Sequence, residues 1–218
     1  MKNFILVVTI CLISCSSQQP NINGHLNDIS NVDLQLKYKT CLANIGSSVK
    51  KTSLEKIPAF LEVSLVDSIF DYWYGTEWDF NGTTQEPQNG KIACGYFVTT
   101  TLKHLGLNIS RVYLAQQASS VLIKEICDET SIKIFTNGKF EKMKTYVNKY
   151  NGNIFIAGLD NHVGFIVREE NELFFIHASG IAPYKVVKDK IDESPLIKNS
   201  QYFMVGHLNF ANWAKGIK

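Results

Sequence analysis

Three residues of the sequence could together perform nucleophilic catalysis: Cys94, His162 and His177. Cys94 lies in the stretch NGKIACGYFVTTTLKHLGL, between a glycine-rich loop and a segment expected to form an amphipathic helix. Unpaired amide N–H groups and the helix dipole favour negative charge at a first helical turn, so we expect the pKa of the Cys94 thiol to be lowered. The thiolate is the attacking form, and it needs a base that takes and returns a proton. The alternative is an ordinary buried thiol, which most free cysteines are.

The stretch DNHVGFIVREENELFFIHASG supplies two histidines on one predicted β-hairpin, with its turn near Glu169, Glu170 and Asn171. We expect Asn171 to be the residue able to adopt a left-handed conformation. A two-residue turn at positions 169–170 would place His162 opposite His177. A turn at positions 170–171 would make them diagonal neighbours on one face, whereas a three-residue turn would separate them, because side chains alternate. The alternative is two unrelated structural histidines.

The elements that must position these residues change in character along the chain. Helical spacing of apolar residues comes first, and a series of short strands follows residue 152. The expected helices cover residues 53–73, 94–105, 111–127 and 140–150, with Gly106 as the stop of the second; the expected strands cover residues 153–159, 162–168, 173–179, 183–188 and 201–208. Helices followed by strands predict an α+β fold with a mostly antiparallel sheet.

The beginning of the chain predicts export. Residues 1–14, MKNFILVVTICLIS, have one lysine before an apolar stretch too short to span a bilayer, as in a signal peptide. The following LISC resembles the lipobox of bacterial lipoproteins, which implies that Cys15 carries a lipid, although Ser14 stands where glycine or alanine is usual. The alternative is a plain secretory signal. We expect residues 15–48 to be a flexible tether and residues 49–218 to form the catalytic domain.

This organisation predicts a protein of the cell envelope. We expect its lipid to anchor it to a bacterial membrane, on the periplasmic side of the outer membrane, as a monomer. The formal net charge of +2 and the scattered lysines and arginines argue against binding to nucleic acid.

The remaining cysteines leave a disulfide open. Loss of Cys11 with the signal, and use of Cys15 for lipid, would leave Cys41, Cys94 and Cys127, which cannot all pair. A disulfide between Cys41 and Cys127 is conceivable. We expect no metal or cofactor, because no HExxH motif or paired-cysteine knuckle is present; the alternative is a zinc site built from Cys94 and the two histidines.

The stretches GTEWDFNGTT and GKIACGYFVTTTLKHLGL, followed by NHVGFIV and LFFIHASG, resemble the NlpC/P60 group of papain-like cysteine peptidases. The resemblance covers residues 75–106 and 153–180, and residues 107–150 have no counterpart in it. It implies a nucleophile helix packed on the sheet. It also implies that Cys94 is the nucleophile, that His162 is the general base and acid, and that His177 orients His162.

The resemblance also implies substrate-binding residues and shows departures. Trp78 occupies the position at which the family often has a tyrosine. Two residues depart from the family's pattern: Ala93 replaces the usual aspartate and Gly95 the usual serine. Tyr96 follows them and is the third candidate for substrate binding, with Trp78 and Asp79. Asp79 is a candidate replacement carboxylate. The backbone N–H of the nucleophile is one expected oxyanion donor, and candidates for the second donor are Thr76, Trp78 and Asn81.

We therefore expect a cysteine hydrolase that cleaves amide bonds of cell-wall peptidoglycan peptides through a Cys-His-His triad. The first alternative is a catalytically silent wall-binding or scaffold lipoprotein on the same fold. The second is an amidase or acyltransferase that acts on other amides or on lipids.

Overall fold

The chain forms an α+β structure in which helices dominate the first part and an antiparallel sheet the second. The computed structural model describes the backbone of residues 22–217 and the side chains of residues 31–214. The expected signal peptide and the lipidated Cys15 therefore lie outside the described residues. The helices, including one π and one 3-10 turn, are α1 (Ile22–Lys51), α2 (Ile57–Ser64), η1 (Leu65–Ile69), α3 (Phe70–Trp73), α4 (Cys94–His104), α5 (Arg111–Ala115), α6 (Ser119–Ile126), η2 (Glu129–Ser131), α7 (Phe140–Lys149), α8 (Pro195–Asn199) and α9 (Phe210–Ile217).

Six strands form the main sheet, in the order β3-β8-β4-β5-β6-β7, and all neighbours are antiparallel. The strands are β3 (Lys133–Thr136), β4 (Ile154–Gly158), β5 (Val163–Glu169), β6 (Glu172–Ala178), β7 (Val186–Lys190) and β8 (Tyr202–His207). A separate parallel pair joins β1 (Glu77–Trp78) to β2 (Lys91–Ile92). The α+β class and the antiparallel sheet are as predicted; β3 is an additional edge strand.

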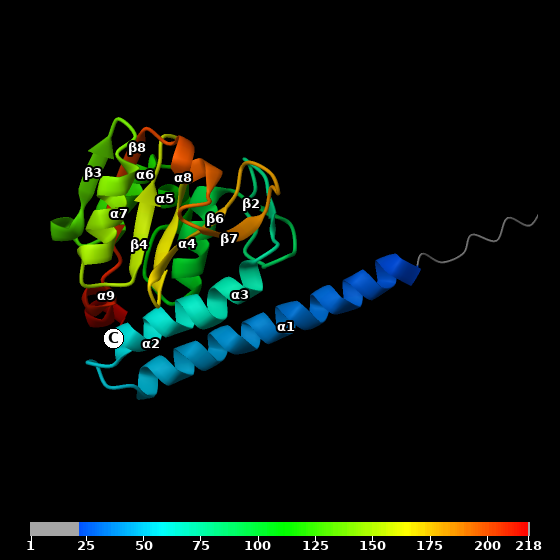
Figure 1. Cartoon of the computed structure of the whole chain (residues 1–218). Coiled ribbons are helices and arrows are strands. Elements are labelled where there is room, and N and C mark those ends of the chain that lie inside the picture. The colour runs from blue at the N-terminus through cyan, green and yellow to red at the C-terminus, as the bar shows by residue number, and fades with distance from the viewer. Residues whose placement is uncertain (1–21, 218) are drawn as a thin grey trace, which may run out of the picture.

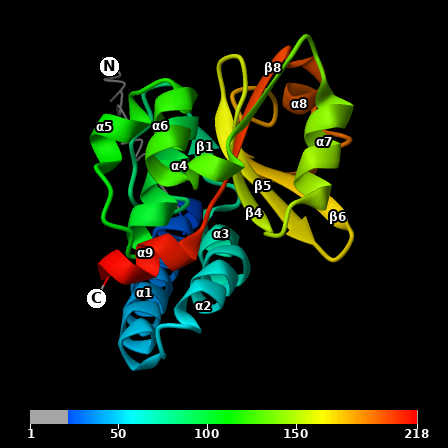
Figure 2. The ribbon, with the colours of Figure 1, turned by 90° about the vertical axis from the view of Figure 1, so that its left-hand side faces the viewer.

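Helices cover both faces of the main sheet, as Figure 2 shows. On one face Phe165 of β5 packs against Phe97 of α4 and Phe70 of α3. On the other face Phe155 and Phe175 belong to a cluster that α7 and α8 close with Met143, Val147 and Ile197. Because side chains alternate along a strand, β5 contributes Phe165 to the first cluster and Ile166 to the second. The central strands are therefore apolar throughout rather than alternating.

Residues 22–51 form a long helix, which differs from the flexible tether expected up to residue 48. Figure 1 shows α1 lying alongside the continuous segment α2–η1–α3. Tyr38, Ile45 and Val49 are buried, at spacings that place them on one helical face. The Tyr38 hydroxyl accepts a hydrogen bond from the indole N–H of Trp73 and forms another, 2.9 Å long, with Nδ1 of His104. The sequence of α1 contains few apolar residues and does not predict a helix. The contacts of Tyr38, Ile45 and Val49 with the rest of the protein stabilise it.

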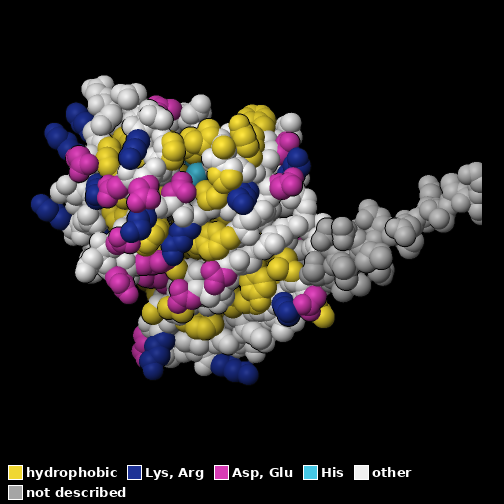
Figure 3. Space-filling model, turned by 45° about the vertical axis from the view of Figure 1, so that its right-hand side comes forward, with side chains coloured by type: hydrophobic (Ala, Val, Ile, Leu, Met, Phe, Trp, Pro, Cys, Tyr) yellow, Lys and Arg dark blue, Asp and Glu magenta, His cyan; other side chains and the backbone are white. Residues whose placement is uncertain are grey.

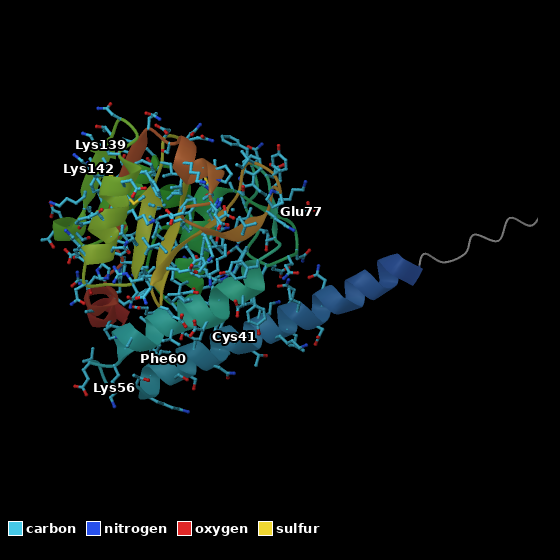
Figure 4. The ribbon with its side chains drawn as sticks, in the orientation of Figure 1. Cys41, Lys56, Phe60, Glu77, Lys139 and Lys142 are labelled. Carbon is cyan, nitrogen blue, oxygen red and sulfur yellow. The ribbon has the colours of Figure 1, made fainter. Side chains whose placement is uncertain are left out.

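A groove of about 650 Å³ runs between α1 and the segment α2–η1–α3. Cys41 on α1 and Phe60 on α2, both labelled in Figure 4, are among the residues that line it. Hydrophobic side chains also gather in the lower part of the face seen in Figure 3. Among the described helices, none is both long and apolar enough to cross a membrane.

Helix α4 begins and ends where the sequence predicts. Ala93, in extended conformation, precedes it, and Gly106 follows it with a φ of +107°. The N–H of Gly106 donates to the carbonyl of Lys103, and the N–H of Leu107 donates to that of Leu102. These two bonds form a Schellman motif, which glycine favours because it adopts positive φ without steric cost. The motif fixes the length of the helix whose first residue is Cys94.

Candidate active site

Cys94 is the first residue of α4, directly after the extended Ala93. The backbone N–H groups of Val163, the first residue of β5, and of Gly95 and Cys94 each act to lower the pKa of the Cys94 thiol. The sulfur therefore lies near the beginning of β5, and His162 is the residue that precedes this strand. The fold thus brings together two residues that are far apart in the sequence.

Cys94 and His162 both line a cavity of about 830 Å³. Its apolar wall consists of Trp78, Phe80, Ala93, Ala115, Ile181 and Leu196. Its polar groups belong to Asn81, Thr83, Tyr96, Gln116, Gln117 and Asn161. Phe80 is 79% exposed, so its ring lies at the solvent-facing edge of this cavity.

The hairpin of β5 and β6 brings the two histidines together. Its register pairs Glu169 with Glu172, so the turn is at positions 170–171, the second of the predicted registers. His162 and His177 are diagonal neighbours, and Nε2 of His162 lies 2.9 Å from Nδ1 of His177. Glu170, with a φ of +52°, takes the left-handed position expected for Asn171.

The histidines occupy the sheet face opposite to α4. His177 stacks on Phe175 with ring centroids 4.3 Å apart, and Phe175 belongs to the cluster beneath α7 and α8. Cys94 approaches from the α4 side, so Cys94 and His162 share the cavity only at the beginning of β5. The site therefore lies at the end of the sheet where β5 begins.

A carboxylate that sequence reasoning missed completes the chain of hydrogen bonds. Oδ2 of Asp189 on β7 lies 3.2 Å from Nε2 of His177. The β6–β7 register pairs His177 with Val187, so Asp189 lies two residues further on the same face. The predicted strand at 183–188 stopped one residue short of it. The signal available in the sequence was an acidic residue at the end of an otherwise apolar and basic strand.

The Asp189 carboxylate determines which atom donates in each hydrogen bond between His162, His177 and Asp189. Ionised Asp189 only accepts hydrogen bonds, so Nε2 of His177 carries a proton and Nδ1 of the neutral ring accepts one. The donor to that nitrogen is the Nε2–H of His162. Nδ1 of neutral His162 is then unprotonated, and no described residue forms a hydrogen bond with it. The arrangement leaves an unprotonated ring nitrogen on His162, the residue that lines the cavity.

The ionisation of the pair differs from the expected thiolate. Burial raises the pKa of the Cys94 thiol, although three backbone N–H groups act in the opposite direction. Burial, followed by repulsion from His177, lowers the pKa of His162 to about 3. The expectation of a lowered thiol pKa was wrong because removal from water outweighs the helix terminus here. At neutral pH the pair is a thiol and a neutral imidazole.

The His177 contact also acts on Asp189. The hydrogen bond from His177 lowers the pKa of Asp189, and burial opposes it. The side chain of His177 is 1% exposed and that of Asp189 is 29% exposed. Asp189 is therefore ionised at neutral pH and supports the bond directions above.

The remaining predicted residues divide into two groups. Trp78, Asn81 and Tyr96 line the cavity with Cys94. Asp79 is not among the lining residues, and its carboxylate accepts a hydrogen bond from the backbone N–H of Asn81. The buried Thr76 does not line the cavity either, and its hydroxyl accepts from the backbone N–H of Gln88. Of the three candidate second oxyanion donors, Trp78 and Asn81 remain.

The glycine after Cys94 has a structural reason. A Cβ at Gly95 would lie 2.4 Å from the carbonyl oxygen of Ala115 at the end of α5. That helix belongs to residues 107–150, the segment without a counterpart in the resemblance. The same segment contributes Ala115, Gln116 and Gln117 to the cavity. It therefore forms part of the cavity wall.

The described cysteines, Cys41, Cys94 and Cys127, are all free. Cys127 is buried, and its thiol donates to the carbonyl of Gly206. No group of three or more histidines, cysteines, aspartates or glutamates within the described part of the chain is arranged to hold a metal ion.

Comparison of the chain with models of protein families, with curated proteins and with solved structures found no match.

Proposed function

We propose that this chain is a cysteine hydrolase of the NlpC/P60 type that cleaves amide bonds of cell-wall peptidoglycan peptides. One observation carries the proposal: Cys94 and His162 line the same cavity, and hydrogen bonds from His162 through His177 to Asp189 leave one ring nitrogen of His162 unprotonated. The triad resembles the family's, and Asp189 extends it.

The reaction begins with a neutral pair. As the Cys94 sulfur attacks the amide carbonyl carbon, its proton passes to Nδ1 of His162, and the carbonyl oxygen becomes an oxyanion. The backbone N–H of Cys94, at the start of α4, is the first donor to that oxygen. The step requires Nδ1 of His162 to reach the sulfur across the beginning of β5.

The C–N bond then breaks, and Nδ1–H of His162 protonates the departing amine. Water attacks the thioester, loses a proton to the same nitrogen, and releases the acid; the proton then returns to sulfur. In both halves His162 is transiently positive. Its Nε2–H donates to His177, which donates to the Asp189 carboxylate, so this chain stabilises the imidazolium.

The location follows from the beginning of the sequence. A signal peptide with Cys15 as lipid acceptor would place the enzyme in the cell envelope, anchored to a membrane by one end and close to the wall. The described residues begin with α1, so this part of the proposal rests on sequence alone.

The proposal is tested by incubating peptidoglycan fragments with the wild-type chain and with Cys94→Ala, and identifying products by mass spectrometry. We expect cleaved amide bonds only with the wild type. Cys41→Ala is the matched control, because Cys41 is a free, half-buried cysteine on α1 outside the cavity. A Cys94 thiol that is inert to alkylating reagents, together with intact fragments, would favour the silent scaffold instead.

A further inference from the structure

The cavity beside Cys94 contains no charged side chain among its described lining residues. Its polar wall consists mainly of carboxamides, which come from four positions: Asn81, Gln116, Gln117 and Asn161. A carboxamide both donates and accepts hydrogen bonds and carries no net charge. It can pair with a peptide group or another carboxamide in both directions.

Arg111, a cation in contact with the lining residue Tyr96, is already engaged. Arg111 is 8% exposed, and its guanidinium lies 4.8 Å from the centre of the Tyr96 ring. It donates to the carbonyls of Thr83 and Thr84 and to the hydroxyl of Thr100. Tyr96 lines the cavity and Arg111 does not, so a carboxylate in the cavity meets no free guanidinium from this residue.

The acidic residues next to the lining residues in sequence are also engaged. Glu77 precedes Trp78, and its carboxylate forms an ion pair with Lys91. Asp79 precedes Phe80, and its carboxylate accepts from the backbone N–H of Asn81. Asp160 precedes Asn161, and its carboxylate accepts from the hydroxyl of Ser200 and the backbone N–H of Gln201. None of these three acidic residues lines the cavity. An ammonium group of a substrate would therefore meet no described carboxylate there.

The cost of placing a charge in such a cavity decides between substrates. Gln116 donates to the Tyr96 hydroxyl and Gln117 to the Tyr113 carbonyl, which leaves their carbonyl oxygens and the exposed amides of Asn81 and Asn161 for a ligand. A carboxylate in this cavity gains no counterion and meets these carbonyl oxygens unfavourably, whereas a carboxamide of nearly the same shape can donate to them. A site whose polar groups form hydrogen bonds with one substrate binds another substrate poorly when those polar groups are left without partners.

We infer that the substrate groups beside the scissile bond are uncharged amides, so that the enzyme acts on peptides whose carboxyl groups near that bond are amidated. The inference rests on the proposed function and narrows its substrate class. The apolar wall of Trp78, Phe80, Ile181 and Leu196 then takes the aliphatic parts of the same peptide.

Two synthetic peptides test this inference. They share one sequence and differ only in a carboxylate or a carboxamide on the residue that provides the scissile carbonyl. Each is titrated calorimetrically into the full chain carrying Cys94→Ala, which removes the nucleophile. We expect the carboxamide peptide to bind about two- to tenfold more tightly, the range expected for one net hydrogen bond at a partly exposed site. Equal binding, tighter binding of the carboxylate peptide, or binding of neither peptide would overturn the inference.

A charge placed in the cavity reverses the preference. Gln116 is exposed and lines the cavity, so Gln116→Lys introduces a cation there without loss of core packing. We expect the Gln116→Lys, Cys94→Ala double variant to lose the preference for the carboxamide peptide or to invert it. Val112→Lys adds the same charge at a position that is 52% exposed and outside the lining, and should leave the preference unchanged. A preference that Gln116→Lys does not move would overturn the inference.

Cleavage by the wild-type chain separates this inference from the proposed function. Cys94-dependent cleavage that favours the carboxylate peptide would overturn the inference alone. Binding that favours the carboxamide peptide, with no Cys94-dependent cleavage, would overturn the hydrolase alone.

Discussion

Replacement of Asp189 by asparagine should inactivate the enzyme by reversing a tautomer rather than by moving an atom. The introduced amide has nearly the shape of the carboxylate but can donate a hydrogen bond to Nε2 of His177. His177 then carries its proton on Nδ1 and donates to Nε2 of His162. The proton of His162 consequently moves to Nδ1, where the mechanism needs a lone pair. Nδ1 of His162 could then no longer accept the proton of Cys94.

The size of the effect follows from the bond that is lost. A hydrogen bond to an ionised group contributes about 1.5–3 kcal/mol, and each 1.36 kcal/mol changes a population tenfold. The bond joins a fully buried histidine to a carboxylate that is 29% exposed, and its length of 3.2 Å is at the long end of the usual range. We therefore expect kcat to fall about 10- to 150-fold, in the lower half of that range.

Two measurements check this prediction. The first is the rate of Cys94-dependent cleavage, and the second is nitrogen NMR of the histidines, which identifies the protonated ring nitrogen in each. Asp192→Asn is the matched control, because Asp192 is 56% exposed and pairs with Lys144 away from the histidines. If Asp189→Asn left the tautomers of both histidines unchanged while the rate fell, the carboxylate would act only through stability, and the relay would be refuted.

Three further predictions concern ionisation and packing. Burial raises the pKa of the Cys94 thiol, so the ultraviolet absorbance of its thiolate should be absent at pH 7 and develop only at a pH above that at which an ordinary thiol ionises. The absorbance is measured as the difference between wild type and Cys94→Ala, and a signal at neutral pH would show an ion pair instead. Gly164→Ala should lower the free energy of unfolding in urea by about 1–3 kcal/mol, because the added Cβ would lie 2.7 Å from Cβ of His177. Gly46→Ala should raise it by about 0.5–1 kcal/mol, because an added Cβ on α1 meets nothing within 4 Å. Equal effects of the two substitutions would contradict the close packing at Gly164. Burial lowers the pKa of His104 to about 4, so on acidification the unfolded chain binds a proton at this residue before the folded chain does. The free energy of unfolding should therefore fall by up to about 3 kcal/mol between pH 6.5 and pH 4. His104→Phe should flatten this part of the stability curve, and an unchanged slope would refute the assignment.

The parts of the site that the sequence predicted depend on local rules. The helix of Cys94 follows from apolar spacing and a terminal glycine, and both lie within one segment. The His162–His177 pair depends on a two-residue turn, which fixes the register of the hairpin within one position. In each case the contact that matters is set by neighbours in the chain.

The parts that the sequence did not predict depend on distant contacts. Asp189 reaches His177 through the β6–β7 pairing, and the seven residues between those strands leave the register open to sequence reasoning. The helical state of α1 depends on Tyr38, whose hydroxyl bridges Trp73 and His104. Similarly, the raised pKa of Cys94 reflects how deeply the fold buries it, which no sequence motif records.

The glycine after Cys94 and the segment at 107–150 have a common explanation. A serine side chain at position 95 would collide with the Ala115 carbonyl, so α5 can occupy its place only if residue 95 is glycine. Directly after α5, Gln116 and Gln117 line the cavity. Under the proposed function, this segment supplies uncharged carboxamides at a site where the resemblance implies a serine and an aspartate beside Cys94. That is the pattern expected when specificity changes and the chemistry is retained.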